Sequence, residues 1–212
     1  MENISEDLKN VIKDYIIFRP KIKKELEEAV DLWYSNREKA YNRYGHISNW
    51  DTSLITDMSR LFEDYSYFND KINNWDVSSV TNMRCMFFGA ISFNQRLDSW
   101  DVSSVNDMAY MFCCTNKFNK NINSWNVSSV KNMEYMFQSS TAFNQNLNSW
   151  DVSSVTNMDR MFSCASSFNQ PLNSWNVSSV KVKEYMFEKS FDRKNALWYD
   201  FEKKNALWYD FD

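Results

Sequence analysis

The chain has 212 residues, a formal net charge of −4 and 25% charged residues. This balance provides no basic surface for a nucleic acid or an anionic membrane, so we expect neither as a partner. Only two glycines and two prolines occur, which excludes collagen-like and linker-rich chains, whereas hydrophobic residues make up 43% and can form a core.

Residues 1–45 are expected to form a helical amino-terminal cap. Ser5 can cap a first helix that ends before Pro20, because proline disfavours helical geometry in the residue before it. Pro20 suits the first turn of a second helix, whose apolar residues recur every three or four positions with one gap at Arg37. Gly45 stands where a left-handed C-cap belongs. The apolar stripe consists of Ile22, Leu26, Ala29, Val30, Trp33, Ala40 and Tyr44.

One 25-residue unit recurs over residues 46–190 without an insertion. A period of about 20–50 residues indicates stacked coils, because one unit cannot bury its apolar face alone. We therefore expect an α/β solenoid, a right-handed stack of leucine-rich-repeat-like coils. The register is set by Trp50, Trp75, Trp100, Trp125, Trp150 and Trp175.

Each repeat is expected to contain a short helix and a short parallel strand. Two serines before Val-x-x-Met-x-x-Met-Phe offer N-cap oxygens, and Val105, Met108, Met111 and Phe112 have the spacing of one helical face. In Trp-x-Val the two apolar residues lie on one side of an extended strand. Strands of successive coils would then pair in parallel.

An asparagine follows the second phenylalanine of each repeat. An amide carries both donors and acceptors, so a column of asparagines can bond backbone groups of its own coil and the next. We expect these side chains to be buried and satisfied, so that Asn119→Ala destabilises the fold by about 1–3 kcal/mol. This structural ladder comprises Asn69, Asn94, Asn119, Asn144 and Asn169.

Residues 191–212 contain an aromatic decapeptide repeated in tandem. An even period keeps both copies on one face of a strand. In a helix, ten residues rotate the chain by about 1000°, which leaves the two copies about 80° apart. The segment is interpreted either as a carboxy-terminal cap or as a cap plus a spare copy that pairs with a second chain in a homodimer. The candidate dimer residues are Leu197, Trp198, Tyr199, Phe201, Leu207, Trp208, Tyr209 and Phe211.

No catalytic, cofactor or metal site is expected, so we predict a protein that is not an enzyme. His46 is the only histidine, and no Ser/His/Asp or Cys/His set can be assembled from the repeating positions. The methionines have core spacing, which disfavours copper ligation. Cysteine spacing does not suit zinc, and the two cysteines that share a column lie about 10 Å apart, beyond disulfide reach, which predicts free thiols.

Binding is the function class that the repeat favours, because stacked repeats offer long regular surfaces. The most variable column of the expected helix is rich in tyrosine and arginine, which dominate binding energy at interfaces. We interpret it as a partner face, or alternatively as a packed ridge that supports neighbouring coils. It contains Arg60, Cys85, Tyr110, Tyr135, Arg160 and Tyr185.

The string Trp-Asp-Val-Ser-Ser-Val-Thr-Asn-Met-x-x-Met-Phe, continued by Phe-Asn-Gln-x-Leu-Asn-Ser, runs from Trp150 to Ser174. It resembles the BspA-like leucine-rich repeat family, which includes bacterial surface proteins and many mycoplasma lipoproteins. Surface members are linked to adhesion and to binding of host matrix proteins. The lead-in from Leu26 to Gly45 and the stretch Ile47-Ser-Asn-Trp-Asp-Thr-Ser look like versions encoded by giant DNA viruses.

Three functions are therefore weighed. The first is a protein–protein interaction scaffold, with dimerisation through its carboxy-terminal end as an additional hypothesis. Its partner is a protein whose identity the sequence does not show. The second is a self-assembling component of a virion or viral factory, and the third is a surface adhesin. The sequence shows no amino-terminal hydrophobic segment and no early cysteine for a lipid, which predicts an intracellular location, in the host cytoplasm or nucleus if viral.

Overall fold

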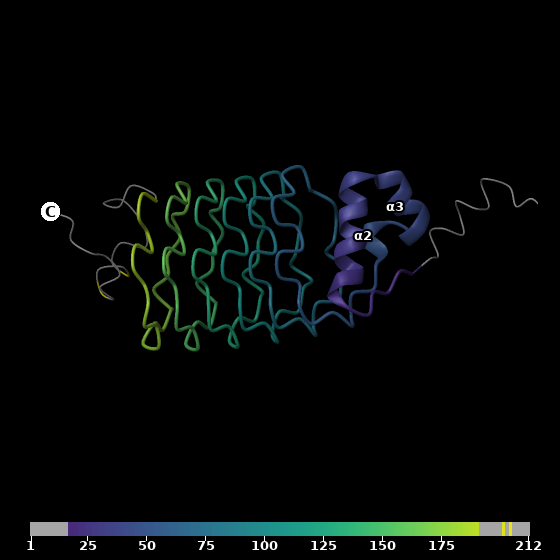
Figure 1. Cartoon of the computed structure of the whole chain (residues 1–212). Coiled ribbons are helices and arrows are strands. Elements are labelled where there is room, and N and C mark those ends of the chain that lie inside the picture. Colours follow the sequence, from purple (N-terminus) through teal and green to yellow (C-terminus); the bar gives the residue numbers. More distant parts are fainter. Residues whose placement is uncertain (1–16, 191–200, 202–203, 205–212) are drawn as a thin grey trace, which may run out of the picture.

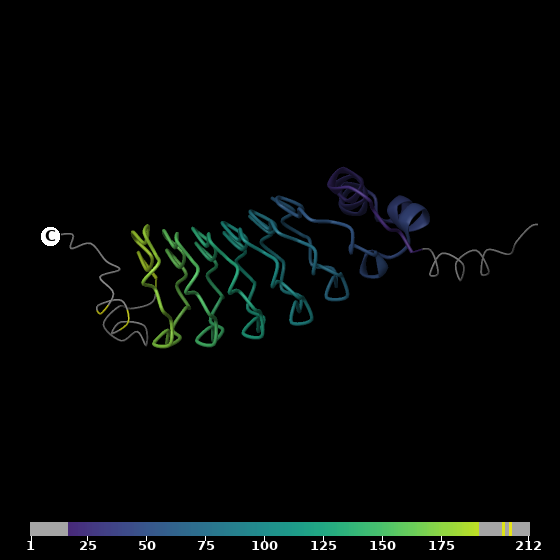
Figure 2. The same ribbon diagram turned by 90° about the horizontal axis from the view of Figure 1, so that it is seen from below.

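The computed structural model describes residues 17–190, Phe201 and Lys204 (Figure 1). Two helices lie at one end, and from there the chain winds through a row of similar coils that lie side by side (Figure 1). Seen from below, the row of coils curves gently (Figure 2). The period of the sequence thus becomes a repeating coil in space.

The amino-terminal end consists of α2 (Lys23–Ser35) and α3 (Arg37–Tyr44), followed by the 3-10 helix η1 (Ile47–Asn49). The single helix predicted here is divided at Asn36, whose side-chain oxygen accepts a hydrogen bond from the Lys39 N–H at 3.0 Å and caps α3. Gly45 ends α3 with a φ of 70°, which glycine adopts without steric cost.

Most of the predicted apolar stripe is buried, but Ile22 is exposed because it precedes the first turn of α2. The helix predicted to start at Ser5 falls, up to residue 16, outside the described residues. Among the helices of the described part, none has the length and apolar character needed to span a bilayer. The buried members of the stripe are Leu26, Ala29, Val30, Trp33, Ala40 and Tyr44.

The predicted α/β solenoid, with one helix and one strand in each coil, is wrong. Within residues 46–190 the repeats contain neither an α-helix nor a strand, and turns follow one another instead. In the segment expected to be helical, the Met111 N–H donates to the Met108 carbonyl at 3.2 Å, and the Cys113 N–H donates to the Tyr110 carbonyl at 3.1 Å. Each of these bonds closes a turn.

The backbone hydrogen bonds explain why no helix forms. Met108, Tyr110 and Phe112 donate their N–H groups at 2.9–3.0 Å to carbonyls 24 residues further along, in the next coil. Turn-closing bonds and bonds between coils therefore alternate along the chain. Tyr110 has a φ of 59° and Cys114 a φ of 57°, and neither value is compatible with a right-handed helix.

The strand predicted at Trp-x-Val is absent from the repeats of the described part. Isolated parallel bridges occur instead at one residue per coil, within the segment expected to be helical. Turns adjoin Trp-x-Val on both sides: the Trp125 N–H donates to the Ile122 carbonyl at 3.1 Å, and the Val130 N–H donates to the Val127 carbonyl at 2.9 Å. No extended run persists between them, so parallel pairing is limited to one position per coil. The bridges join Asp57, Asn82, Asp107, Asn132, Asn157 and Val182 in that order.

Aromatic rings stack in columns through the interior. Phe112 lies 5.5 Å from Phe87 and 5.7 Å from Phe137, and 4.1 Å from Phe118 of its own coil. Because each of these rings is fully buried, each contributes about 1.5–3 kcal/mol to folding. Methionines complete the core beside them: Met58, Met83, Met86, Met108, Met111, Met133, Met136, Met158, Met161 and Met186.

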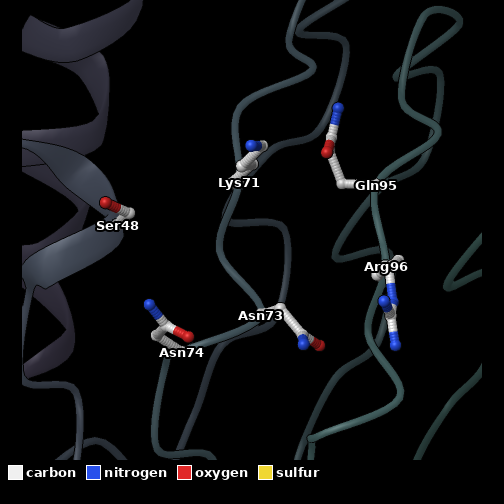
Figure 3. A pocket seen from close by; sticks show the side chains of 6 residues that line it. All are labelled: Ser48, Lys71, Asn73, Asn74, Gln95 and Arg96. Atoms are coloured by element: carbon white, nitrogen blue, oxygen red, sulfur yellow. The ribbon is translucent and has the colours of Figure 1, made fainter.

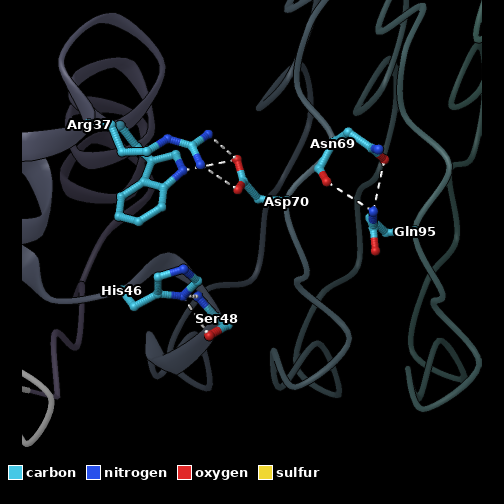
Figure 4. Close-up of polar contacts among 7 residues, drawn as sticks. Arg37, His46, Ser48, Asn69, Asp70 and Gln95 are labelled. Atoms are coloured by element: carbon cyan, nitrogen blue, oxygen red, sulfur yellow. Dashed lines mark hydrogen bonds and ion pairs between the residues drawn. The ribbon is translucent and has the colours of Figure 1, made fainter.

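The helical end is held on the first coils by polar contacts (Figure 4). The Arg37 guanidinium donates two hydrogen bonds to the Asp70 carboxylate, at 2.8 and 2.6 Å. The indole N–H of Trp33 donates to the same carboxylate at 3.0 Å. These bonds join α2 and α3 to a residue of the first coil.

Candidate interaction surface

The predicted Arg/Tyr column occupies one turn position in every coil, and every member has a positive φ, between 49° and 62°. Such values are uncommon for bulky residues. Because they recur in all six coils, they belong to the architecture of the repeat. The column therefore lies on a series of turns, and its predicted place on a helix face is wrong.

Four residues of the column and Arg84 form a continuous ladder, which we call the Arg/Tyr ridge. The rings of Tyr110 and Tyr135 stack at 4.6 Å with planes 6° apart. The Arg84 guanidinium lies 5.0 Å from the Tyr110 ring. Arg160 lies 5.6 Å from the Tyr135 ring and 4.6 Å from the Tyr185 ring, and donates a hydrogen bond of 2.6 Å to the Tyr135 hydroxyl. All five side chains are half-buried.

Arg60 and Cys85 do not take part in this ladder. Arg60 is exposed and pairs with Glu63 at 2.8 Å, and the buried Cys85 occupies the column position between Arg60 and Tyr110. Sequence reasoning missed Arg84, because it belongs to the neighbouring column. Its position directly before Cys85, a member of the column, was the one feature of the sequence that could have indicated its place in the ridge.

Acidic side chains neutralise the ridge. The Glu134 carboxylate accepts a hydrogen bond from Arg84 at 3.1 Å and another from the Asn157 amide at 2.7 Å. Asp159 lies 3.5 Å from Arg160, but one of its oxygens is buried without a hydrogen-bond partner. Burial raises the pKa of the Asp159 carboxyl above its ordinary value, and this effect exceeds the opposing effect of Arg160.

The asparagine ladder joins neighbouring coils along another part of the surface. The backbone N–H of each asparagine after Asn69 donates to the side-chain oxygen of the asparagine in the preceding coil at 2.9–3.1 Å, as in the bond from Asn144 to Asn119. A glutamine amide adds a second bond, as from Gln95 to Asn69 (Figure 4). The predicted burial is wrong, since Asn69 and Asn119 are exposed and the other three are half-buried.

All four cysteines are free thiols, and two of them lie close together. The sulfur atoms of Cys113 and Cys114 are 3.8 Å apart. A hydrogen bond from the Cys113 thiol, with a second from Ser139, lowers the pKa of the Cys114 thiol to about 6, whereas the pKa of the Cys113 thiol is raised. Cys164 occupies the same column as Cys114 but has Ser163 in place of the neighbouring thiol.

A polar hollow of about 390 Å³ lies where η1 meets the first two coils (Figure 3). Ser48 borders it from η1, and the other lining side chains come from two successive coils (Figure 3). No sequence pattern pointed to this hollow, because it arises where the regular repeat begins. Its lining consists of Ser48, Lys71, Asn73, Asn74, Gln95 and Arg96.

The remaining predicted positions are placed as follows. His46 has a structural setting: its Nδ1 lies 2.7 Å from the Ser48 hydroxyl, and its ring meets the Trp33 ring edge-on at 5.1 Å. Of the candidate dimer residues, all but Phe201 lie outside the described part, and Phe201 is buried against Trp175. Over residues 17–190, no cluster of three or more His, Cys, Asp or Glu side chains could hold a metal ion.

The comparison with protein families decides where this chain belongs. The sequence profile of DUF285, described as "Mycoplasma protein of unknown function", matches residues 31–140 and 115–207, which together exceed half of the chain. The chain belongs to the DUF285 family. The predicted likeness to a mycoplasma-type repeat family is thereby confirmed. None of the curated proteins and none of the solved structures compared with the chain matches it.

Proposed function

We propose that this DUF285 member is a non-enzymatic protein that binds another protein through the Arg/Tyr ridge. The observation that carries the proposal is the stack of Tyr110 on Tyr135, with an arginine over the outer face of each ring. Tyrosine and arginine supply a large share of binding energy at interfaces. Side chains that are already ordered lose little conformational entropy when a partner binds.

The charges of the ridge favour a protein partner over a nucleic acid. Arg84 and Arg160 are already paired, with Glu134 and Asp159 respectively. Binding to a phosphate backbone depends on cations that can displace counterions, and these two would first have to leave their carboxylates. A partner that uses ring contacts and hydrogen bonds meets no such cost.

The test replaces both rings at once. Tyr110→Asn/Tyr135→Asn removes the stack while keeping residues that tolerate a positive φ, so the turns should form as before. The control is Tyr67→Ala, because Tyr67 is 84% exposed and lies outside the ridge. Partners would be identified by cross-linking in the native cell, and the affinity of the purified partner for each variant would then be measured.

We expect the double variant to bind its partner at least tenfold more weakly, as loss of a hot spot implies, and the control to bind normally. Equal binding by all three proteins would refute the role of the ridge. Loss of folding in the double variant, seen by circular dichroism, would assign the ridge to structure, which is the alternative interpretation of this column.

We further infer an intracellular location and an origin in a giant DNA virus. The four free thiols support a reducing compartment. The lead-in from Leu26 to Gly45 supports the viral origin by its resemblance to giant-virus versions of the repeat. Immunolocalisation in infected cells tests both, and labelling of a surface outside the cell would contradict them. No contact within the described part favours the self-assembling or adhesin roles.

Homodimerisation through the carboxy-terminal decapeptides stays a prediction. It can be tested by ending the chain after Lys203 and measuring the mass of both forms by light scattering. A dimer that becomes a monomer on truncation supports the prediction, whereas two monomers contradict it.

A further inference from the structure

The hollow beside η1 lies where a regular contact between coils is interrupted. In later coils the residue before the repeat's tryptophan bonds an asparagine of the preceding coil through both its side chain and its backbone. The Ser99 hydroxyl accepts from the Asn73 amide at 2.9 Å, and the Ser99 N–H donates to the Asn73 side-chain oxygen at 3.2 Å. Ser174 and Asn148 form the same two bonds, both at 3.0 Å. Asn74 occupies the same column.

Position 48 in the preceding turn would supply the partner of Asn74, and it holds a serine. The Ser48 hydroxyl is engaged with the His46 ring at 2.7 Å and with the Asn49 side chain at 3.2 Å. No hydrogen bond joins the Asn74 side chain to another residue of the described part. The amide is therefore available to a ligand, and it lines the hollow.

Two cations border the same hollow. The Lys71 ammonium has no hydrogen bond or ion pair with a described residue, and Lys71 is exposed. Arg96 uses Nε and Nη2 to bond Asp98, at 3.0 and 2.6 Å, which leaves the N–H groups of Nη1 for another acceptor. None of the six lining residues carries a carboxylate. The hollow is therefore rich in donors. Asp98 offsets the charge of Arg96, so the uncompensated positive charge comes from Lys71.

Its volume and lining together select the ligand class. A volume of about 390 Å³ lies within the usual range for small-molecule sites, but the lining is polar rather than apolar. Ammonium and guanidinium groups form charge-assisted hydrogen bonds with oxyanions, which are about twice as strong as neutral ones. Amides and hydroxyls can both donate to and accept from the hydroxyl groups of a sugar.

We propose that this hollow binds a small hydroxylated oxyanion, such as a sugar phosphate or a sugar acid. The anionic group lies between Lys71 and Arg96. The hydroxyl groups of the ligand bond to the Asn74 amide and to the second N–H of the Asn73 amide, whose first N–H donates to Ser99. This site is separate from the Arg/Tyr ridge, so it does not depend on the function proposed for the ridge.

A nucleic acid strand is disfavoured by how the column continues. The positions equivalent to Lys71 and Arg96 in the next three coils hold Asn121, Asn146 and Pro171. Positive charge on this column therefore ends after two coils. A strand bound along the row would need cations at successive coils.

The repeat supplies its own test variants. Lys71→Asn installs the residue found at this position in two later coils, and Asn74→Ser installs the residue found in four. Arg96→Asn provides a second charge-removing variant if Lys71→Asn does not fold. The matched control is Lys131→Asn, because Lys131 is exposed and lies outside the hollow.

Binding would be measured by NMR on the isotope-labelled full chain at constant ionic strength. The probes are glucose 6-phosphate, glucuronate, glucose and inorganic phosphate. We expect one or both anionic sugars to shift the side-chain amide signals of Asn73 and Asn74 and the backbone signals of Lys71. Shifts from glucose 6-phosphate alone would identify a phosphate site, and shifts from glucuronate alone a carboxylate site.

Affinity for the anionic sugar should fall about tenfold or more in Lys71→Asn, because a charge-assisted bond is lost, and should be unchanged in Lys131→Asn. Asn74→Ser should bind more weakly than the wild type. Absence of shifts with both anionic sugars would overturn the proposal. Inorganic phosphate or glucose binding as tightly as the anionic sugars would overturn it as well, since one of the two recognition elements would then be unnecessary.

Discussion

The indole N–H of Trp125 donates a hydrogen bond to the carbonyl of Leu97, 28 residues earlier in the preceding coil, at 2.9 Å. The same bond recurs at Trp75, Trp100, Trp150 and Trp175. Trp50 is the exception in the described part of the column: its indole nitrogen is buried without a partner. The helical end that precedes it supplies ring contacts but no carbonyl at this place.

This contrast predicts different costs for the same substitution. Trp125→Phe removes a buried hydrogen bond, whereas Trp50→Phe removes a buried donor that has no partner. Both changes take away the same ring volume. We therefore expect Trp125→Phe to lower the free energy of unfolding by about 1–3 kcal/mol more than Trp50→Phe does. Urea denaturation of both variants measures the difference, and equal costs would mean that the indole bonds contribute nothing.

Replacing an asparagine of the ladder is predicted to destabilise the protein less than it would if the side chain were fully buried. Asn119 accepts hydrogen bonds from the Asn144 N–H at 3.0 Å and from the Gln145 amide at 2.7 Å, but its side chain is exposed. Because water can replace the lost partner in part, Asn119→Ala should lower the free energy of unfolding by about 1 kcal/mol. Ser124→Ala, in the same coil and exposed, serves as the control. A loss no greater than that of the control would show that the ladder does not stabilise the stack.

The paired thiols predict an unusual pH dependence of the alkylation of Cys114. The hydrogen bond from Cys113 holds the pKa of the Cys114 thiol at about 6, and the thiolate is the form that reacts with iodoacetamide. Alkylation of Cys114, followed by peptide mass spectrometry, should therefore reach half its maximal rate near pH 6. Cys113→Ala, which removes the donor, should move this midpoint upward, and Cys164 in the same sample reports any change in overall accessibility. An unmoved midpoint would show that Cys113 does not stabilise the thiolate.

Replacing Asp159 is predicted to stabilise the protein at neutral pH. Burial raises the pKa of this carboxyl above its ordinary value of 3.8, so the ionised form is less stable in the folded chain than in the unfolded chain. The resulting loss of stability is absent below pH 3.8 and grows as the pH rises through the raised pKa. Asp159→Asn should thus be more stable than the wild type at neutral pH, with the difference vanishing in acid. Thermal melts at both pH values test this, and lower stability at neutral pH would mean that the contact with Arg160 dominates.

The sequence allowed the period and the core of this protein to be predicted, because both depend on where apolar side chains recur. Trp125, Met108 and Phe112 are buried as their spacing indicated. The backbone conformation could not be predicted in the same way. Apolar residues spaced by three and four suit one face of a helix, but they equally suit a series of turns that closes every three residues.

The positive φ values could not be predicted from the sequence. Tyr110 and Cys114 both have a positive φ, yet neither residue type indicates such a conformation. Glycine does indicate it, and Gly89 occupies the same column as Cys114. The conformation is imposed by hydrogen bonds to the next coil, which a single repeat cannot reveal. The same holds for the candidate surfaces: the tyrosine column could be read from the sequence, whereas Arg84 and the polar hollow depend on contacts between coils.

The central claim is that backbone hydrogen bonds between coils replace those of a helix, and it can be tested by NMR. Scalar couplings transmitted through hydrogen bonds connect the donor nitrogen with the acceptor carbonyl carbon. The structure predicts couplings from Met108, Tyr110 and Phe112 to carbonyls 24 residues further along, which for Tyr110 is the carbonyl of Glu134. Couplings from the same amides to carbonyls four residues earlier would indicate a helix in each repeat and would contradict the account.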